Sequence, residues 1–212
     1  MKILSLIRTL KSVLYAYDSD QWEKRVGALG KDSYLRGPIS CANPSLIFVG
    51  NHSHIFGQAN YIIRNGKFIV GDYTGIAQGL TVITGNHISE KGKLFNDCLQ
   101  LDEQDVIIED DVRIGAFVTI LPGVKIRRGA IIGAGTVLRF SIPPYAVVTG
   151  NPAKIVGFRM NPQEALEHEA ALYPEEKRLS ADELFDNYEK YYFNRMSEII
   201  AVSYTHLTLP TT

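Results

Sequence analysis

A strict six-residue repeat between Ile108 and Pro143 limits what this chain can fold into. The stretch divides into the hexads IEDDVR, IGAFVT, ILPGVK, IRRGAI, IGAGTV and LRFSIP. Neither the helical period of about 3.6 residues nor the alternation of a strand repeats every six residues over this length. Such self-similarity is typical of a solenoid, in which each unit stacks on its neighbour and buries a continuous core. An aliphatic residue opens each hexad: Ile108, Ile114, Ile120, Ile126, Ile132 and Leu138.

Three hexads complete one triangular turn if each hexad is a short strand followed by a corner. The aliphatic residue of each hexad then points inward and stacks on its counterpart one turn later, as Ile108 would on Ile126. The same spacing begins near Leu46, so we predict at least four turns between about residues 46 and 145. A solenoid with no enzymatic role would show the same repeat. Glycines that favour corners or close contacts between turns lie at Gly115, Gly123, Gly129, Gly133 and Gly135.

The period fails between Ile88 and Val106. The sequence SEKGKLFNDCLQLDEQD is polar and charged, with too few apolar residues to line the solenoid. We therefore expect residues 88–106 to leave the solenoid as an excursion loop. Long loops in compact domains are often functional, and this one directly follows His87.

Residues 1–45, before the solenoid domain at residues 46–160, are predicted to form a helical and extended lead-in. Two hypotheses fit its apolar stripe: a helix packed on its own protein or oligomer, or a basic helix at a membrane surface. The first is favoured here. The stripe consists of Ile3, Ile7, Leu10, Leu14 and Tyr17.

The chain after the solenoid is expected to be helical. Residues 161–200 are predicted to form two helices that start at Asn161 and Ser180 and are separated at Pro174. Residues 201–212 resemble translated adapter sequence rather than native protein, so we leave them out of the functional argument.

Composition excludes some classes of partner. The net charge of −1 gives no electrostatic reason for binding nucleic acid or an anionic surface through the whole domain. Cys41 and Cys98 fit neither a metal spacing nor a disulfide framework, which favours a reducing, cytoplasmic compartment. The sequence contains no apolar run near the roughly 20 residues that span a bilayer.

Among the titratable residues, His87 is the candidate for chemistry. It precedes the excursion loop, where a rigid scaffold can present an imidazole that exchanges protons near neutral pH. The sequence contains no Ser-His-Asp order, nucleotide-binding glycine loop or zinc spacing. His168 is expected on a helix surface, and His206 lies in the excluded tail. The histidines are His52, His54, His87, His168 and His206.

The segment TGNH, the loop, then VIIEDDVRIGAFVTILPGVKIRRGAIIGAGTV and IPPYAVVTGNPAKIV together resemble one branch of the hexapeptide-repeat acyltransferases. This branch contains xenobiotic, galactoside and polysaccharide O-acetyltransferases. The resemblance covers about residues 46–160 and implies a left-handed parallel β-helix; periodicity alone does not set the hand. It also implies that His87 is the catalytic base.

The implied reaction is direct acetyl transfer from acetyl-CoA to a hydroxyl group. His87 would take the hydroxyl proton and then protonate the departing CoA sulfur, while backbone amides near Gly115 and Ala116 are candidate oxyanion donors. Some relatives have a Thr-Lys pair where this chain has Arg139-Phe140, and a serine at Ala116. The resemblance assigns CoA binding to Gly115, Ala116, Gly133, Ala134, Arg139, Lys154 and Arg159.

The favoured acceptor is a sugar of a surface polysaccharide or its precursor. Four acidic residues of the loop are candidates for orienting the His87 imidazole: Glu90, Asp102, Glu103 and Asp105. Relatives usually form homotrimers with the site between adjacent chains, so a homotrimer is expected. Candidate acceptor-binding residues are Asn60, Asn65 and Asn86.

Two alternatives stay open. The acceptor could be an amino sugar or sugar nucleotide, or the protein could be a non-catalytic assembly subunit of the same fold. The hexapeptide fold also includes a zinc-dependent, carbonic anhydrase-like class with histidines in the hexads after the loop. Residues 108–143 contain no histidine, so we predict no metal and interpret His52 and His54 as exposed solenoid residues.

Overall fold

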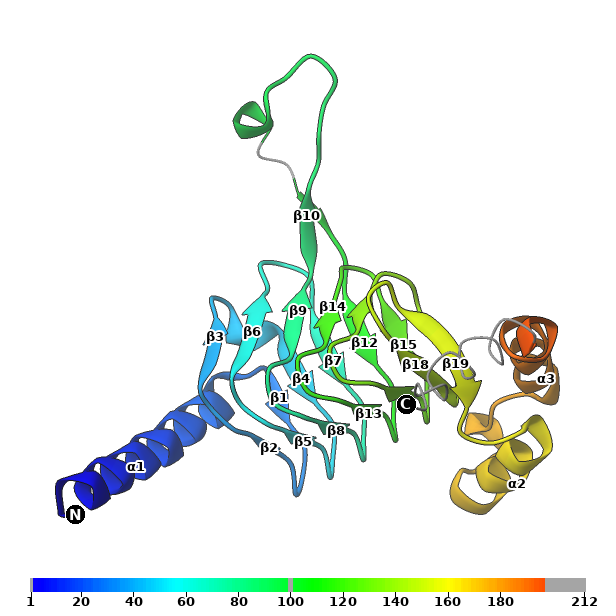
Figure 1. Ribbon diagram of the computed structural model, residues 1–212, viewed down its shortest axis with the longest axis horizontal. Coiled ribbons are helices and arrows are strands. Elements are labelled where there is room, and N and C mark those ends of the chain that lie inside the picture. The colour runs from blue at the N-terminus through cyan, green and yellow to red at the C-terminus, as the bar shows by residue number, and fades with distance from the viewer. Residues whose placement is uncertain (1, 99–100, 197–212) are drawn as a thin grey trace, which may run out of the picture.

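The computed structural model describes residues 2–98 and 101–196. Its centre is a parallel β-solenoid of about five turns (Figure 1). Three sheets form the sides of the solenoid, and each turn contributes one short strand to each side. The left-handed winding of the solenoid stays a prediction.

We name the sides A, B and C in the order in which the chain visits them, and each corner by the sides it joins. Side A contains β1 (Ala28–Leu29), β4 (Ile47–Val49), β7 (Phe68–Val70), β12 (Val106–Ile108) and β15 (Lys125–Ile126). Side B contains β2 (Tyr34–Leu35), β5 (His54–Ile55), β8 (Gly75–Ile76), β13 (Arg113–Ile114), β16 (Ile131–Ile132), β18 (Ala146–Thr149) and β19 (Lys154–Phe158). Side C contains β3 (Ile39–Cys41), β6 (Ala59–Ile62), β9 (Thr81–Ile83), β14 (Thr119–Ile120) and β17 (Val137–Leu138).

The predicted stacking of the hexads is confirmed. The aliphatic residues pair in parallel register eighteen positions apart on all three sides, and all of them are buried. Successive side chains of a strand point alternately to the core and to the outer face. A fixed register between turns therefore keeps the same set of residues inside in every turn. The pairs are Ile108 with Ile126, Ile114 with Ile132, and Ile120 with Leu138.

The parallel ladders begin at Ala28, earlier than the start near residue 46 that the sequence predicts. Leu29 pairs with Val49, and Leu35 pairs with Ile55, twenty positions later in both cases. The offset exceeds eighteen because the first C–A corner is longer and contains a 3₁₀ turn at Pro44–Leu46. Residues 28–45 therefore belong to the solenoid.

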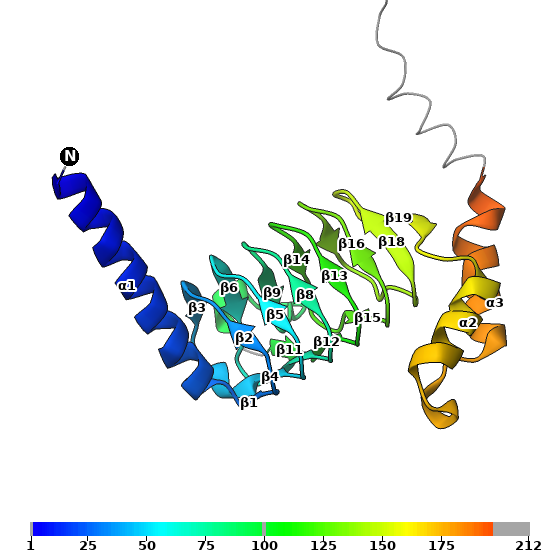
Figure 2. The ribbon, with the colours of Figure 1, turned by 90° about the horizontal axis from the view of Figure 1, so that it is seen from below.

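The N-terminal segment is one continuous helix, α1 (Lys2–Arg25). Trp22, near its C-terminal end, is buried against the solenoid core, and the Arg25 guanidinium lies 4.6 Å from the Trp22 ring centroid. The rest of α1 projects away from the first turn (Figure 2).

Two helices follow the solenoid, as the capping residues predicted. α2 (Pro162–Leu172) starts after Asn161, which accepts from the Glu164 N–H in a capping box, and α3 (Ala181–Tyr191) starts after Ser180. Short 3₁₀ turns lie at Glu175–Lys177 and Phe193–Arg195. Residues 197–212, including the excluded tail and His206, lie outside the described residues.

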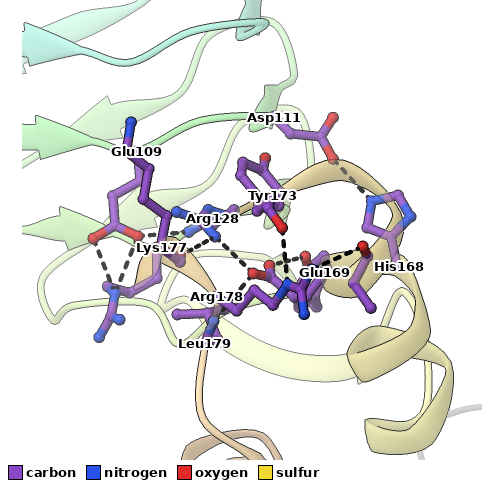
Figure 3. Close-up of polar contacts among 12 residues, drawn as sticks. Glu109, Asp111, Arg128, His168, Glu169, Tyr173, Lys177, Arg178 and Leu179 are labelled. Atoms are coloured by element: carbon purple, nitrogen blue, oxygen red, sulfur yellow. Dashed lines mark hydrogen bonds and ion pairs between the residues drawn. The ribbon is translucent and has the colours of Figure 1, made fainter. Parts of the chain in front are cut away.

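A buried carboxylate docks α2 onto the last turns (Figure 3). Glu169 accepts from the Tyr145 hydroxyl (2.5 Å) and from the Leu179 N–H (3.1 Å), and it pairs with Arg128 (2.7 Å). The Arg128 guanidinium also lies 3.9 Å from the Tyr173 ring centroid. A buried charge is tolerated when it is paired and hydrogen-bonded, so this cluster fixes the helix in place.

Tyr145 and Tyr61 are both buried tyrosines, but their hydroxyl groups differ. The Tyr145 hydroxyl donates to Glu169, whereas the Tyr61 hydroxyl has no hydrogen-bond partner within residues 2–98 and 101–196. Burial raises the pKa of Tyr145, and the adjacent Glu169 carboxylate raises it further. Burial also raises the pKa of Tyr61.

We expect Tyr145→Phe to destabilise the fold by about 1–3 kcal/mol, because it leaves a buried Glu169 oxygen unsatisfied. Tyr61→Phe should be neutral or stabilising, since it removes an unpaired hydroxyl. Each tyrosine keeps its proton in the folded state, whereas the unfolded chain loses it above about pH 10. The free energy of unfolding of the parent should therefore fall as the pH rises beyond that value. The free energy of unfolding of each variant should fall less over the same range. Urea unfolding from neutral pH to about pH 11 measures both effects. An equal loss of unfolding free energy in the two variants at neutral pH would contradict the different roles given to the two hydroxyl groups.

Candidate active site

The chain leaves the solenoid at the C–A corner of the third turn as an antiparallel hairpin (Figure 1). The hairpin consists of β10 (Gly85–His87) and β11 (Leu101–Glu103), with a 3₁₀ turn at Phe95–Asp97 beyond them. His87 is exposed at the end of β10 and pairs with Leu101. A hollow of about 170 Å³ beside it is lined by Ile62, Arg64, Gly85, His87, Leu101 and Glu103.

Hydrogen bonds fix the base of this hairpin to the solenoid. The Asn65 side-chain amide donates to Glu103, and the Gln104 N–H donates to the Thr84 carbonyl (2.7 Å). The Lys67 N–H donates to Asp105 (2.7 Å). His87 is therefore carried by a backbone that is tied to rigid neighbours on both sides, as a positioned base requires.

Only one of the four candidate acids lines the hollow with His87. Glu103 pairs with Gly85, so it lies on the same face of the hairpin as His87, at a diagonal position. Its Oε1 atom is buried and has no hydrogen-bond partner in the described chain. A buried carboxylate oxygen of this kind needs a partner, which makes Glu103 the candidate for orienting the imidazole.

The other three acids have different partners. Asp102 lies on the opposite hairpin face and accepts from Gln104 (2.9 Å), and Asp105 caps Lys67. Glu90 lies in the excursion, where a hydrogen bond from Lys93 and one from Cys98 lower its pKa.

The predicted acceptor-binding asparagines do not all meet at the hollow. Asn65 holds Glu103, and Asn60 is an exposed residue of β6 two positions before Ile62, hence on the same outer face of side C. Asn86 pairs with Asp102 and faces away from His87.

Most of the residues assigned to CoA binding gather at the B–C corner. Gly115 and Ala116 follow β13, and Gly133 and Ala134 follow β16 one turn later. A Cβ atom at Gly133 would lie 2.9 Å from the Thr149 hydroxyl, and Thr149 pairs with Lys154, so this lysine borders the same corner. The corner therefore combines these small residues with Lys154 and with the exposed ring of Phe117, which follows Ala116.

Three of the residues assigned to CoA binding or to the oxyanion fit this corner less well. Arg139 follows β17 and lies across side C from this corner. Arg159 lies near the A–B corner, where it pairs with Asp111 (2.5 Å). The Gly115 N–H donates to the Ile132 carbonyl (2.8 Å), so it is not an open oxyanion donor.

A second hollow, which the sequence did not suggest, lies on the outer face of side B. Tyr34 and His54 stack there with ring centroids 4.4 Å apart, and the Arg36 guanidinium lies 4.6 Å from the Tyr34 ring. The groove measures about 520 Å³ and ends at the B–C corner. Its lining residues include Tyr34, His54, Phe56, Gln78, Arg113 and Ala116.

The remaining histidines have separate environments. His52 stacks on Tyr73 at the A–B corner (4.7 Å), whereas His54 stacks on Tyr34 on side B. The two histidines therefore do not form a pair. His168 is half-buried against Tyr145 rather than free on a helix surface. The described part of the chain contains no cluster of three metal-binding side chains.

His87 therefore lies at the C–A corner, whereas most of the residues assigned to CoA binding lie at the B–C corner, with side C between the two.

The comparisons with known proteins agree with this architecture. The family model described as bacterial transferase hexapeptide (six repeats) matches residues 105–139. A probable macrolide acetyltransferase from Lysinibacillus sphaericus is 34% identical over 148 residues, covering 62% of this chain and 81% of that protein. The chain belongs to the hexapeptide-repeat acyltransferase family.

Solved structures show the same fold. A hexapeptide-repeat acetyltransferase from Vibrio cholerae superimposes with a TM-score of 0.61 and 26% identity, over 66% of this chain and 77% of that chain. A maltose O-acetyltransferase from Clostridium difficile 630 superimposes with a TM-score of 0.57 and 29% identity, over 64% and 71%.

The match to other relatives is partial. Serine acetyltransferase 4 from Arabidopsis thaliana is 34% identical over 124 residues, which is 56% of this chain but 35% of that protein. The chain thus spans about a third of that relative and about half of another curated one.

Proposed function

We propose that this protein transfers the acetyl group of acetyl-CoA to a hydroxyl group of a saccharide, with His87 as the base. The observation that carries the proposal is the position of His87 at the anchored base of the hairpin, beside Glu103, in a chain of this family. The imidazole takes the hydroxyl proton as the oxygen attacks the thioester carbonyl carbon. It returns that proton to the sulfur as the carbon–sulfur bond breaks.

Both surfaces described above contribute to the proposed substrate sites. The B–C corner fits an extended thiol-bearing chain, because Ala116, Gly133 and Ala134 leave room, and Lys154 supplies positive charge for phosphate. The aromatic groove on side B fits the apolar face of a sugar ring. A maltose O-acetyltransferase among the similar structures supports a sugar hydroxyl as acceptor.

We expect His87→Ala to lower kcat by about 10²–10⁴-fold, while the Kd for CoA changes by less than about twofold. The assay is CoA release from acetyl-CoA with a panel of sugars and amino sugars. His52→Ala, at another corner, is the matched control and should keep parental activity. Turnover with amino sugars alone would favour N-acyl transfer. A parent that neither binds nor consumes acetyl-CoA would favour a non-catalytic assembly role.

We expect Glu103→Gln to lower kcat by about tenfold or more, because an amide oxygen accepts an imidazole N–H more weakly than a carboxylate does and orients the ring less firmly. Asp102→Asn, on the opposite hairpin face, is the matched control and should keep the parental kcat. Steady-state kinetics with the same sugar panel measure both variants. Equal rates for the parent and Glu103→Gln would contradict the orienting role of Glu103.

The separation of the two corners supports a site made by two chains of a homotrimer. In a closed ring of three, the C–A corner of each chain faces the B–C corner of the next. One chain then supplies His87 and Glu103, and its neighbour supplies Ala116, Ala134 and the aromatic groove. This arrangement gives three sites per trimer.

Mixing two inactive variants tests this arrangement. His87→Ala removes the base, and Ala134→Trp blocks the exposed CoA corner. In trimers reassembled at random from equal amounts, about a quarter of the sites combine an intact base with an intact corner. Activity should therefore recover to about a quarter of the parental value. A chain that carries both substitutions, mixed with His87→Ala, is the control and should stay inactive. No recovery in mixed trimers of verified composition would place the whole site within one chain.

A further inference from the structure

The projecting part of α1 has an apolar face that the described chain leaves uncovered. The C-terminal end of the helix packs on the solenoid through Trp22. The preceding turns extend away from the first turn of the solenoid (Figure 2). The exposed apolar side chains, with their exposed fractions, are Leu6 (60%), Ile7 (45%), Leu10 (53%), Val13 (59%) and Leu14 (64%).

These side chains form one broad face. At about 100° per residue, the five residues fall within an arc of about 120°. The same spacing places Thr9 and Lys11 outside this arc. The arc is wider than the narrow seam that a two-stranded coiled coil buries, and the exposed apolar residues span little more than one heptad. The geometry favours a flat apolar surface as the partner over another helix.

The charged residues at the start of α1 are all cations. Residues 2–17 contain Lys2, Arg8 and Lys11 but no acidic residue, and the first carboxylate in the chain is Asp18. The whole chain has a net charge of −1, so the excess of positive charge is a local property of residues 2–17. A segment with an apolar face and only positive charges is complementary to a surface that is apolar beneath and anionic above.

None of the helices within residues 2–98 and 101–196 has the length and apolar character to cross a membrane.

We propose that α1 binds the surface of an anionic lipid bilayer, with its apolar face in the acyl boundary and its cations among the headgroups. Residues 2–17 make a helix about 24 Å long, enough for several side chains to enter the interface together. Trp22 ties this helix to the solenoid, so the catalytic domain is held beside the membrane. The proposal does not rest on the acetyltransferase activity.

The test is sedimentation of the full chain with vesicles. We expect binding to phosphatidylcholine vesicles with about 30% phosphatidylglycerol to exceed binding to pure phosphatidylcholine by about tenfold, and to weaken in about 0.5 M salt. Leu10→Gln, which keeps the charge, should weaken binding by about tenfold. Thr9→Gln, on the polar face, is the matched control and should change it by less than about twofold.

Position 10 lies outside the solenoid, so Leu10→Gln should leave the circular dichroism and thermal unfolding of the protein unchanged. Absence of binding to the anionic vesicles would overturn the proposal, as would equal binding of the parent and Leu10→Gln. If Leu10→Gln instead lowers the oligomeric mass in analytical ultracentrifugation and leaves vesicle binding intact, a second copy of this chain covers the face.

Discussion

Each turn of the solenoid is held to the next by backbone hydrogen bonds and by aliphatic side chains that stack in register. A shift of one residue in that register would turn every core side chain outward. Corners can therefore lengthen only by insertions that return the chain to the same phase. The structure contains offsets of eighteen, twenty and twenty-one residues between paired turns, and a hairpin excursion in the third turn. The inward residues stay buried throughout.

This tolerance of insertions at corners explains where the candidate site lies. The hairpin raises the offset between paired turns to 38 residues, as between Phe68 and Val106, without disturbing the ladders. Asn65 and Gln104 tie its base to the strands beside it. His87 thus combines a rigid backbone with an exposed position. The B–C corner differs because its small residues keep the chain close to the ladder and leave space outside.

The core register could be predicted from the sequence because an exact period of six fixes which residues face inward. The first turn was not predicted from the sequence. Leu29 and Leu35 are six residues apart, as the repeat requires, but each pairs with a residue twenty positions later instead of eighteen. For the same reason, the stacking of Tyr34 on His54 could not be foreseen. His87 could be chosen as a candidate because the period fails directly after it. Glu103 could not be distinguished from three other acids, because the register of the hairpin decides which of them shares a face with His87.

A parallel solenoid ends in strands whose outer hydrogen-bonding groups would accept another chain, so two such molecules can in principle join end to end into a growing filament. Both ends of this solenoid carry features that oppose such growth. Trp22 of α1 lies against the first turn, and β19 reverses direction to run antiparallel beside β18 before α2 begins. Trp22 at one end and the reversed strand β19 at the other therefore make both ends unlike the interior turns, which disfavours end-to-end growth into a filament.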